Sequence, residues 1–307
     1  MVIASKQTAT VALGGGGARG IAHLGVVESL QATPMDIKRY VGVSIGALAG
    51  ALCAADSDTS RVQRRVVDYL TSERFQTKQA ALFSAAPKAE EPATSGLFAW
   101  YNQIRKYLGA RRKLATLFGR PGLLGPDVMQ DVVDALIPDI DITETTTPLS
   151  IVALDLLSGR RVVLTRGSLK TAVMASAAIP GVFPPIATGD MLLCDIGMMD
   201  ALPAKLAKSY GASLTIAVDV GGSIEPITAC ETAADMMLRL SDIGEPLVRE
   251  YSQAFADVII RPDVSLHPWY DFSDPRSLIE LGRAAVQRSS LPAPTFTISR
   301  KHSPAGV

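Results

Sequence analysis

Val41-Gly42-Val43-Ser44-Ile45-Gly46-Ala47 is the stretch that decides the fold, because it reads as a strand that turns sharply into a helix. Gly42 and Gly46 flank Ser44 in a G-x-S-x-G pattern, and a tight elbow needs residues without a side chain at such positions. An elbow of this kind presents the serine hydroxyl at the carboxyl edge of a sheet. The N-terminus of the next helix lies beneath it, where positive partial charge favours an oxyanion. Alone, the stretch also fits an ordinary glycine turn before a buried helix.

The composition excludes some classes of partner. The 307 residues carry 30 basic and 30 acidic side chains, so no net field favours nucleic acid or a strongly anionic partner. A hydrophobic content of 48% allows a large core. We therefore expect a single domain over residues 1–290, followed by a loose polar tail over 291–307.

The cysteines and the N-terminus indicate the compartment. Cys53, Cys194 and Cys230 are an odd number, widely spaced in apolar surroundings without a C-x-x-C pair, which favours a reducing compartment, core positions and no structural zinc. The first ten residues lack a basic region followed by an apolar run, and no apolar stretch approaches the roughly 18 residues of a membrane span. The sequence predicts a cytoplasmic protein that is soluble or peripheral to the membrane.

Strands and helices alternate along the chain. Residues 8–13 read as a strand, followed by a four-glycine loop, a helix over 21–31 and the strand that delivers Ser44. Loop and serine thus lie in one βαβ unit with parallel neighbouring strands, whose carboxyl ends open on the edge where such sheets bind ligands. Further strands are predicted at 149–153, 161–164, 191–194, 214–220 and 258–260, and helices at 61–70, 169–177, 203–210, 232–255 and 275–288. The pattern predicts a mostly parallel sheet covered by helices on both faces, with a helical insertion over about 76–125.

The glycine loop suggests an anion site. Its successive N–H groups are unshielded at a helix N-terminus, so we expect the amides of Gly16 and Gly17 to face an oxyanion, with Arg19 fixing the loop or adding positive charge. Gly15, Gly17 and Gly20 also match the G-x-G-x-x-G pattern of dinucleotide sites. That alternative needs an acidic residue after the second strand, whereas this chain has Ser44 there and Asp36 is expected before the strand.

A base for Ser44 must come from few candidates. The chain has three histidines, His23, His267 and His302, and a structural or surface role is favoured for each. An α/β-hydrolase triad of Ser44, Asp195 and His267 stays open, although the serine comes on only the second strand. Asp195 ends a short apolar strand and enters a glycine turn at Gly197, where a carboxylate could face Ser44. An Asx-type turn is the structural alternative for Asp195.

Three motifs together resemble the patatin-like phospholipase family. They are the glycine-rich oxyanion loop over 15–20, including Ala18, the nucleophile motif over 42–46, and the aspartate motif over 195–197. Residues 175–185 look like the family's segment ahead of the aspartate, and Leu202-Pro203 falls where that pair usually follows. The resemblance covers about 1–75 and 125–265. It implies a three-layer α/β/α fold and lipid acyl hydrolysis by a Ser-Asp dyad without histidine.

The chain departs from the family pattern at two positions. Ile196 replaces the first glycine of the usual Asp-Gly-Gly or Asp-Gly-Ala, and Asp200 stands where asparagine is frequent. A β-branched residue does not easily take a positive φ, so we expect the turn after Asp195 to follow another path.

The resulting hypothesis is a serine acyl hydrolase acting on phospholipid, lysophospholipid or acylglycerol esters. Ser44 attacks, Asp195 accepts the proton and the loop amides hold the oxyanion, with no metal or organic cofactor implied. A non-catalytic lipid-binding or partner-binding protein with the same fold is the alternative that Ile196 motivates. The sequence does not define the oligomeric state.

A basic segment in the insertion suggests membrane contact. Apolar residues over 97–118 recur at near-helical spacing with five arginines and lysines among them. Such a helix could lie at an anionic lipid interface or cover Ser44, and a helix packed on the core is the alternative.

Overall fold

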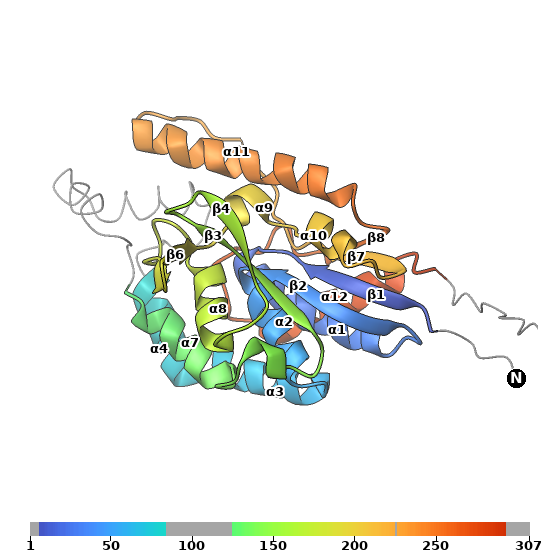
Figure 1. Cartoon of the computed structure of the whole chain (residues 1–307). Coiled ribbons are helices and arrows are strands. Elements are labelled where there is room, and N and C mark those ends of the chain that lie inside the picture. The colour runs from blue at the N-terminus through green and yellow to red at the C-terminus, as the bar shows by residue number, and fades with distance from the viewer. Residues whose placement is uncertain (1–5, 84–124, 225, 293–307) are drawn as a thin grey trace, which may run out of the picture.

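The computed structural model describes residues 6–83, 125–224 and 226–292. Eight strands in these ranges form one sheet in the order β5-β6-β3-β2-β1-β7-β8, with β4 paired to β3 outside this path (Figure 1). Strands β1, β2, β3, β7 and β8 are parallel, whereas the pairs β3–β4, β3–β6 and β5–β6 are antiparallel. The strands are β1 Thr8–Leu13, β2 Asp36–Val43, β3 Leu149–Asp155, β4 Arg160–Leu164, β5 Ile186–Thr188, β6 Met191–Cys194, β7 Leu214–Val218 and β8 Val258–Ile260.

Helices cover the sheet on both faces. The alternation along β1 shows this, because Val11 and Leu13 enter the larger apolar cluster with α1, α2, α3, α8 and α12, whereas Ala12 packs in a second cluster with α10. The three-layer α/β/α architecture with a mostly parallel sheet is therefore confirmed. The helices are η1 Gly17–Ile21, α1 Ala22–Gln31, α2 Ile45–Ala55, α3 Thr59–Leu70, α4 Glu73–Phe83, α7 Asp127–Leu136, η2 Ile142–Glu144, α8 Leu169–Ala177, α9 Gly197–Asp200, α10 Ala204–Ser209, α11 Ala233–Gln253 and α12 Pro275–Arg288.

Helix α11 forms the outermost element of one face. It begins with a capping box in which Thr232 and Asp235 satisfy each other's backbone N–H groups, and it packs on the short helix α9. Figure 1 shows α11 lying across the molecule above α9 and α10, farther from the sheet than either. This placement brings its inner side over the carboxyl edge of the central strands.

Two expectations need correction. Asp36 is the first residue of β2 and not a residue before it, because its amide donates to Gln7 O and continues the pairing with β1. It still lies at the end of β2 opposite to Ser44, so it is not placed for a ribose. Cys53 and Cys194 are buried, but Cys230 is exposed because it lies in the open segment before α11.

Other expectations fall outside the described residues. The proposed interfacial segment 97–118, most of the insertion, His302 and most of the tail belong to this group. Within the described ranges, no helix combines the length and apolar composition that crossing a membrane requires.

Candidate functional site

Ser44 occupies a strained elbow between β2 and α2. Its φ of 56° and ψ of −125° make it the one non-glycine residue with a positive φ among the described residues. Its carbonyl accepts from the amides of Ala47 and Leu48, so the helix starts immediately after the serine. Such backbone strain persists only where the surrounding structure holds it, and it concentrates at functional sites.

The flanking glycines allow the elbow to approach its neighbours. A Cβ on Gly46 would lie 2.1 Å from the carbonyl oxygen of Leu13 at the end of β1, and one on Gly42 would lie 2.5 Å from Gly46 O. Neither distance is compatible with a side chain. The G-x-S-x-G spacing therefore has a steric cause, which is the close contact of α2 with both β1 and β2.

Ser176 on α8 fixes the Ser44 backbone. The Ser44 amide donates to Ser176 Oγ at 2.9 Å, and the Ser176 hydroxyl donates onward to Val152 O at 2.6 Å. Ser176 is fully buried, so these two hydrogen bonds account for a hydroxyl that water does not reach. Sequence reasoning did not single out this residue, although it lies in the segment 175–185 that resembles the family.

Asp195 follows β6 and faces Ser44. Its amide donates to Ala178 O at 2.9 Å, and its Oδ1 accepts from the Gly197 amide at 2.7 Å. Burial raises the pKa of Asp195 to about 6, against the opposing effects of hydrogen bonds from the Ser44 hydroxyl and the Gly197 amide. The expected Asx-type turn is thus present, and the same carboxylate also meets the serine.

Ile196 follows a path that any L-residue adopts. Its φ of −90° and ψ of 0° need no glycine, and its side chain is buried in the apolar cluster between the sheet and α10. The turn therefore has apolar burial at a position where the family pattern has glycine, and it needs no positive φ there.

The glycine loop has two amides without an acceptor. The amides of Gly15 and Ala18 donate to Ala201 O at 2.8 Å and Trp269 O at 2.6 Å. Neither Gly16 nor Gly17 has a hydrogen-bond acceptor for its amide within the described part of the chain. Gly17 has a φ of 61°, and a Cβ there would lie 2.2 Å from Trp269 O. The free amides are the two that the sequence singled out.

Two buried arginines donate hydrogen bonds to carbonyl groups of the glycine loop. Arg19 Nε donates to Gly16 O at 3.1 Å, and Arg249 Nη2 on α11 donates to Gly15 O at 3.2 Å. Arg249 is also paired with Asp219 and Glu245. Burial would lower the pKa of Arg249, but the two carboxylates outweigh it and raise the pKa. Burial, with Arg249 nearby, lowers the pKa of Arg19 to about 10, so both arginines stay charged at neutral pH.

The described histidines have structural partners. His23 is fully buried with Nε2 at 2.8 Å from Gly14 O, and burial lowers its pKa to about 4, which keeps it neutral beneath the loop. His267 Nε2 lies 2.7 Å from Asp271 O in the loop before α12. Neither histidine lines a cavity that contains Ser44.

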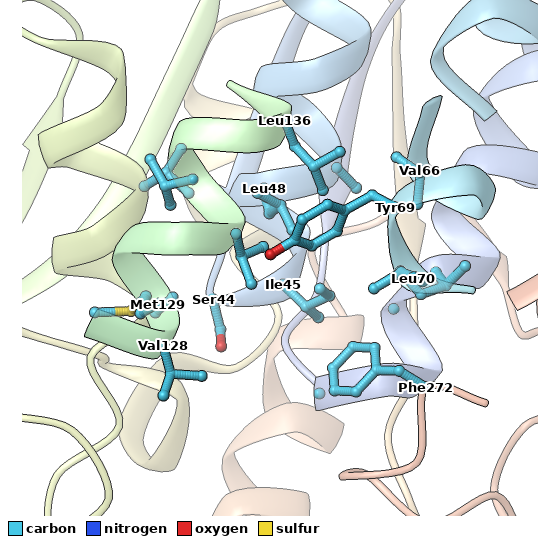
Figure 2. Close-up of a pocket in the computed structure, with 18 of the residues that line it drawn as sticks. Ser44, Ile45, Leu48, Val66, Tyr69, Leu70, Val128, Met129, Leu136 and Phe272 are labelled. Atoms are coloured by element: carbon cyan, nitrogen blue, oxygen red, sulfur yellow. The ribbon is translucent and has the colours of Figure 1, made fainter. Parts of the chain in front are cut away.

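Ser44 lies at the junction of two cavities of different character. The first, of about 170 Å³, is lined almost entirely by apolar side chains. Figure 2 shows Ser44 beside Ile45 and Leu48, with Tyr69, Leu70 and Phe272 on one side and Val128 and Met129 on another. Helices α2, α3, α4 and α7 together supply more than half of the lining residues, so the cavity extends from the serine between helices on one side of the sheet.

The second cavity, of about 140 Å³, has a more polar lining than the first, and we call it the polar cavity. It lies beneath α11 and shares Gly17, Ser44, Ile179 and Trp269 with the apolar cavity. Of the predicted site residues, its lining contains Gly15, Gly16, Gly17, Arg19, Ser44, Asp195 and Gly197. Gly20 lines the apolar cavity, whereas Ala18, Gly42 and Gly46 line neither and act through the backbone. No group of three or more metal-ligating side chains occurs within the described ranges.

Comparison with known proteins identifies the family. The sequence profile of the patatin-like phospholipase family matches residues 11–208, a range that contains the glycine loop, Ser44 and Asp195. The chain therefore belongs to the patatin-like phospholipase family.

Relatives share this domain in longer proteins. An uncharacterised NTE family protein of Mycobacterium tuberculosis is 31% identical over 219 residues, which cover 71% of this chain and 51% of that protein. Lysophospholipase NTE1 of Yarrowia lipolytica is 30% identical over 226 residues, covering 74% of this chain and 14% of that protein. The chain thus spans about half the length, or less, of these relatives. Among solved structures, VipD of Legionella pneumophila is similar with 15% identity and a TM-score of 0.43, covering 93% of this chain and 67% of VipD.

Proposed function

We propose that this chain is a serine acyl hydrolase that cleaves lipid carboxylic esters with Ser44 as nucleophile and Asp195 as base. One observation carries the proposal. Ser44 stands on a strained elbow against a buried carboxylate with a raised pKa, at the point where an apolar and a polar cavity meet.

The chemistry follows from the positions of these groups. Asp195 takes the Ser44 proton while Oγ bonds to the ester carbonyl carbon, and the negative charge moves to the carbonyl oxygen. The free amides of Gly16 and Gly17 stabilise that oxyanion. As the bond to the leaving alcohol breaks, Asp195 returns the proton to the alcohol oxygen. Water, deprotonated by Asp195, then attacks the acyl-enzyme; as the bond to Ser44 Oγ breaks, Asp195 returns the proton to Oγ and the fatty acid is released.

The raised pKa of Asp195 suits a direct base. A carboxylate with an ordinary pKa near 4 is a weak acceptor for a hydroxyl proton at neutral pH, and a pKa of about 6 brings the group closer to its operating range. The described histidines favour the dyad over a triad, because His23 is neutral beneath the loop and His267 is bonded to Asp271 O.

The cavities support assignment of the two ends of the substrate. The apolar cavity matches an acyl chain, and the polar cavity beneath α11 matches the alcohol part of the ester. Phospholipids, lysophospholipids and acylglycerols all consist of an apolar acyl chain esterified to a more polar alcohol part. The Yarrowia relative is named as a lysophospholipase, which agrees with a lipid substrate of this kind.

Covalent labelling tests the proposal most directly. A fluorophosphonate probe is expected to label the wild-type protein and to leave Ser44→Ala unlabelled, with p-nitrophenyl ester hydrolysis lost in parallel. His267→Ala and His23→Gln serve as controls and should keep turnover within about tenfold, since loss of a general base costs roughly 10² to 10⁴. Wild-type protein that is folded yet neither labelled nor active on any acyl length would refute the enzyme, and His267→Ala as inactive as Ser44→Ala would replace the dyad by a triad.

A further inference from the structure

Helix α11 carries an apolar stripe on its outer side. Six large apolar side chains on this one helix are between 39% and 69% exposed: Met236, Met237, Leu240, Ile243, Leu247 and Tyr251. From Met236 to Tyr251 the stripe is about 22 Å long at 1.5 Å per residue. Soluble proteins seldom expose contiguous apolar surface of this extent unless it contacts a partner or a membrane.

The opposite side of the same helix forms a wall of the polar cavity. Ser241, Glu245 and Arg249 line that cavity, and at 100° per residue they lie on the face opposite to Leu240 and Leu247. A helix with its side chains is about 10 Å thick, so the stripe and the cavity containing Ser44 are separated by roughly one helix diameter. A surface in contact with the stripe would therefore lie about one helix diameter from the cavity that contains Ser44.

We propose that this stripe, called the α11 stripe, docks the protein onto the surface of a lipid bilayer. The inference rests on the proposed function, because a lipid ester must leave a lipid aggregate to reach Ser44. Burying apolar side chains in the bilayer interface would hold the cavity at the level of the headgroups. Tyr251, with an aromatic ring and a polar hydroxyl, suits that interface.

The stripe fits a bilayer better than a second helix. Ala233, Met236, Leu240, Ile243 and Leu247 have the spacing of a coiled-coil seam, which charged side chains normally flank to select the partner. On one side of this seam the flanking positions are Met237, Gly244 and Tyr251, so the apolar surface is broader than a seam. Arg239 and the exposed Glu250 are the charged side chains that border this face. A broad apolar face with few charges matches a lipid surface.

Vesicle binding by the full chain tests the proposal. The Ser44→Ala protein leaves the lipids intact and is expected to co-sediment with phosphatidylcholine vesicles at both low and high salt. Adding Leu240→Glu and Leu247→Glu should weaken partitioning at least about tenfold, because two exposed leucines no longer enter the interface. In the wild-type background, the same pair should slow hydrolysis of vesicle lipid while turnover of a short soluble ester is unchanged.

A matched control separates the stripe from general surface polarity. Leu266, in the loop before α12, is 76% exposed compared with 64% for Leu240, so Leu266→Glu makes the same change at a comparable exposure. It should bind vesicles as the parent does, whereas the single Leu240→Glu should bind measurably less. Equal losses in the two single variants, or a parent that does not bind zwitterionic vesicles, would overturn the proposal.

Sedimentation equilibrium tests whether the α11 stripe binds a second copy of the chain instead of a bilayer. A dimer that Leu240→Glu dissociates, with vesicle binding unaffected, would assign the stripe to a second copy of the chain and overturn the bilayer proposal. Failure of the proposed function would look different, because it would abolish turnover of the soluble ester in wild-type protein and leave the vesicle binding of Ser44→Ala unaltered.

Discussion

The nucleophile turn and the aspartate turn present their side chains by opposite means. Ser44 has a φ of 56° and is flanked by glycines at which a Cβ would collide with a backbone carbonyl oxygen. Ile196, after Asp195, has ordinary backbone angles and a buried apolar side chain. Close backbone contacts and the Ser176 hydroxyl thus fix the serine, whereas packing and an Asx-type hydrogen bond fix the carboxylate.

The difference predicts which positions tolerate change. A turn held by close backbone contact cannot accommodate an added Cβ, since the carbonyl that the Cβ would meet is part of the sheet and cannot move away. A turn held by side-chain packing can lose or gain methylene groups at moderate cost. Substitutions in the nucleophile turn should therefore cause loss of folded enzyme, whereas a substitution of Ile196 in the aspartate turn should have almost no effect on turnover.

The largest effect is expected for Gly46→Ala. The new Cβ would lie 2.1 Å from Leu13 O, so the start of α2 must move away from β1. We expect a loss of at least about 3 kcal/mol in the free energy of unfolding, with little folded enzyme. Gly50→Ala on the same helix is the control, because the nearest atoms to its Cβ would be side-chain atoms of Leu13 and Leu149 at 3.3 Å and of Tyr40 at 3.7 Å, and it should stay within about 1 kcal/mol of wild type. Urea denaturation of the two variants measures the contrast, and equal stabilities would contradict it.

Asp195→Asn is expected to abolish turnover and stabilise the fold. The folded carboxyl has its pKa raised to about 6, so its ionisation opposes folding by up to about 3 kcal/mol at pH values above 6. This penalty shrinks as the pH falls from 6 towards the unfolded pKa near 4, and it vanishes below that. Asparagine is uncharged and can still accept from the Gly197 amide.

Thermal unfolding as a function of pH measures this effect. The Asp195→Asn variant should melt several degrees above wild type at pH 8 and equally at pH 4. In wild type, kcat/KM should fall about tenfold per pH unit below 6, as Asp195 becomes protonated. An inactive variant that is less stable at pH 8 would show that the carboxylate is a structural anchor rather than a strained base.

Ser176→Ala should have an intermediate effect. It removes the acceptor of the Ser44 amide while the serine side chain remains. We expect turnover to fall roughly 10- to 100-fold, because a small displacement of a nucleophile costs up to about 10², and stability to fall by about 1–3 kcal/mol. Ser150→Ala, also fully buried but bonded to Tyr210 and Arg39, should lose stability without a comparable loss of turnover. Equal kinetic losses in both variants would deny Ser176 a specific role.

The fold was largely predictable from local pattern. The helix at 169–177 and the strands at 191–194 and 258–260 occur with the predicted bounds, because apolar runs and turn residues delimit them clearly. Strand β5 was missed because its three residues follow a proline-rich turn and lack a periodic signal. Helix α7 was missed because it begins at the end of a segment whose composition indicated an irregular insertion.

The site was predictable only where a motif marks it. Ser44, Asp195 and the glycine loop stand in recognisable turns, and the structure brings them together around one cavity. Arg249 supports Gly15 from 234 positions away, and Ser176 supports Ser44 from 132 away. No local pattern reports such contacts, because they depend on which helix faces overlie the sheet edge. The apolar cavity beside Ser44 likewise results from packing between α2, α3, α4 and α7.

The smallest effect on turnover is expected for Ile196→Gly, which restores the residue usual in the family. Because Ile196 already has backbone angles open to every residue, glycine gives the turn no conformation that it needs, and the Asx-type bond to Gly197 persists. We expect turnover to stay within about threefold of wild type. Stability should fall by at least about 2 kcal/mol, because a buried isoleucine side chain is lost from the apolar cluster that includes Leu202 and Ala204. Ile196→Val, which removes one methyl group, should cost about 0.5–1.5 kcal/mol and leave kcat unchanged. Stopped assays on a soluble ester and urea denaturation of both variants test this separation. A marked rise in kcat in Ile196→Gly alone would show that isoleucine misdirects the carboxylate, and that the aspartate turn depends on backbone freedom after all.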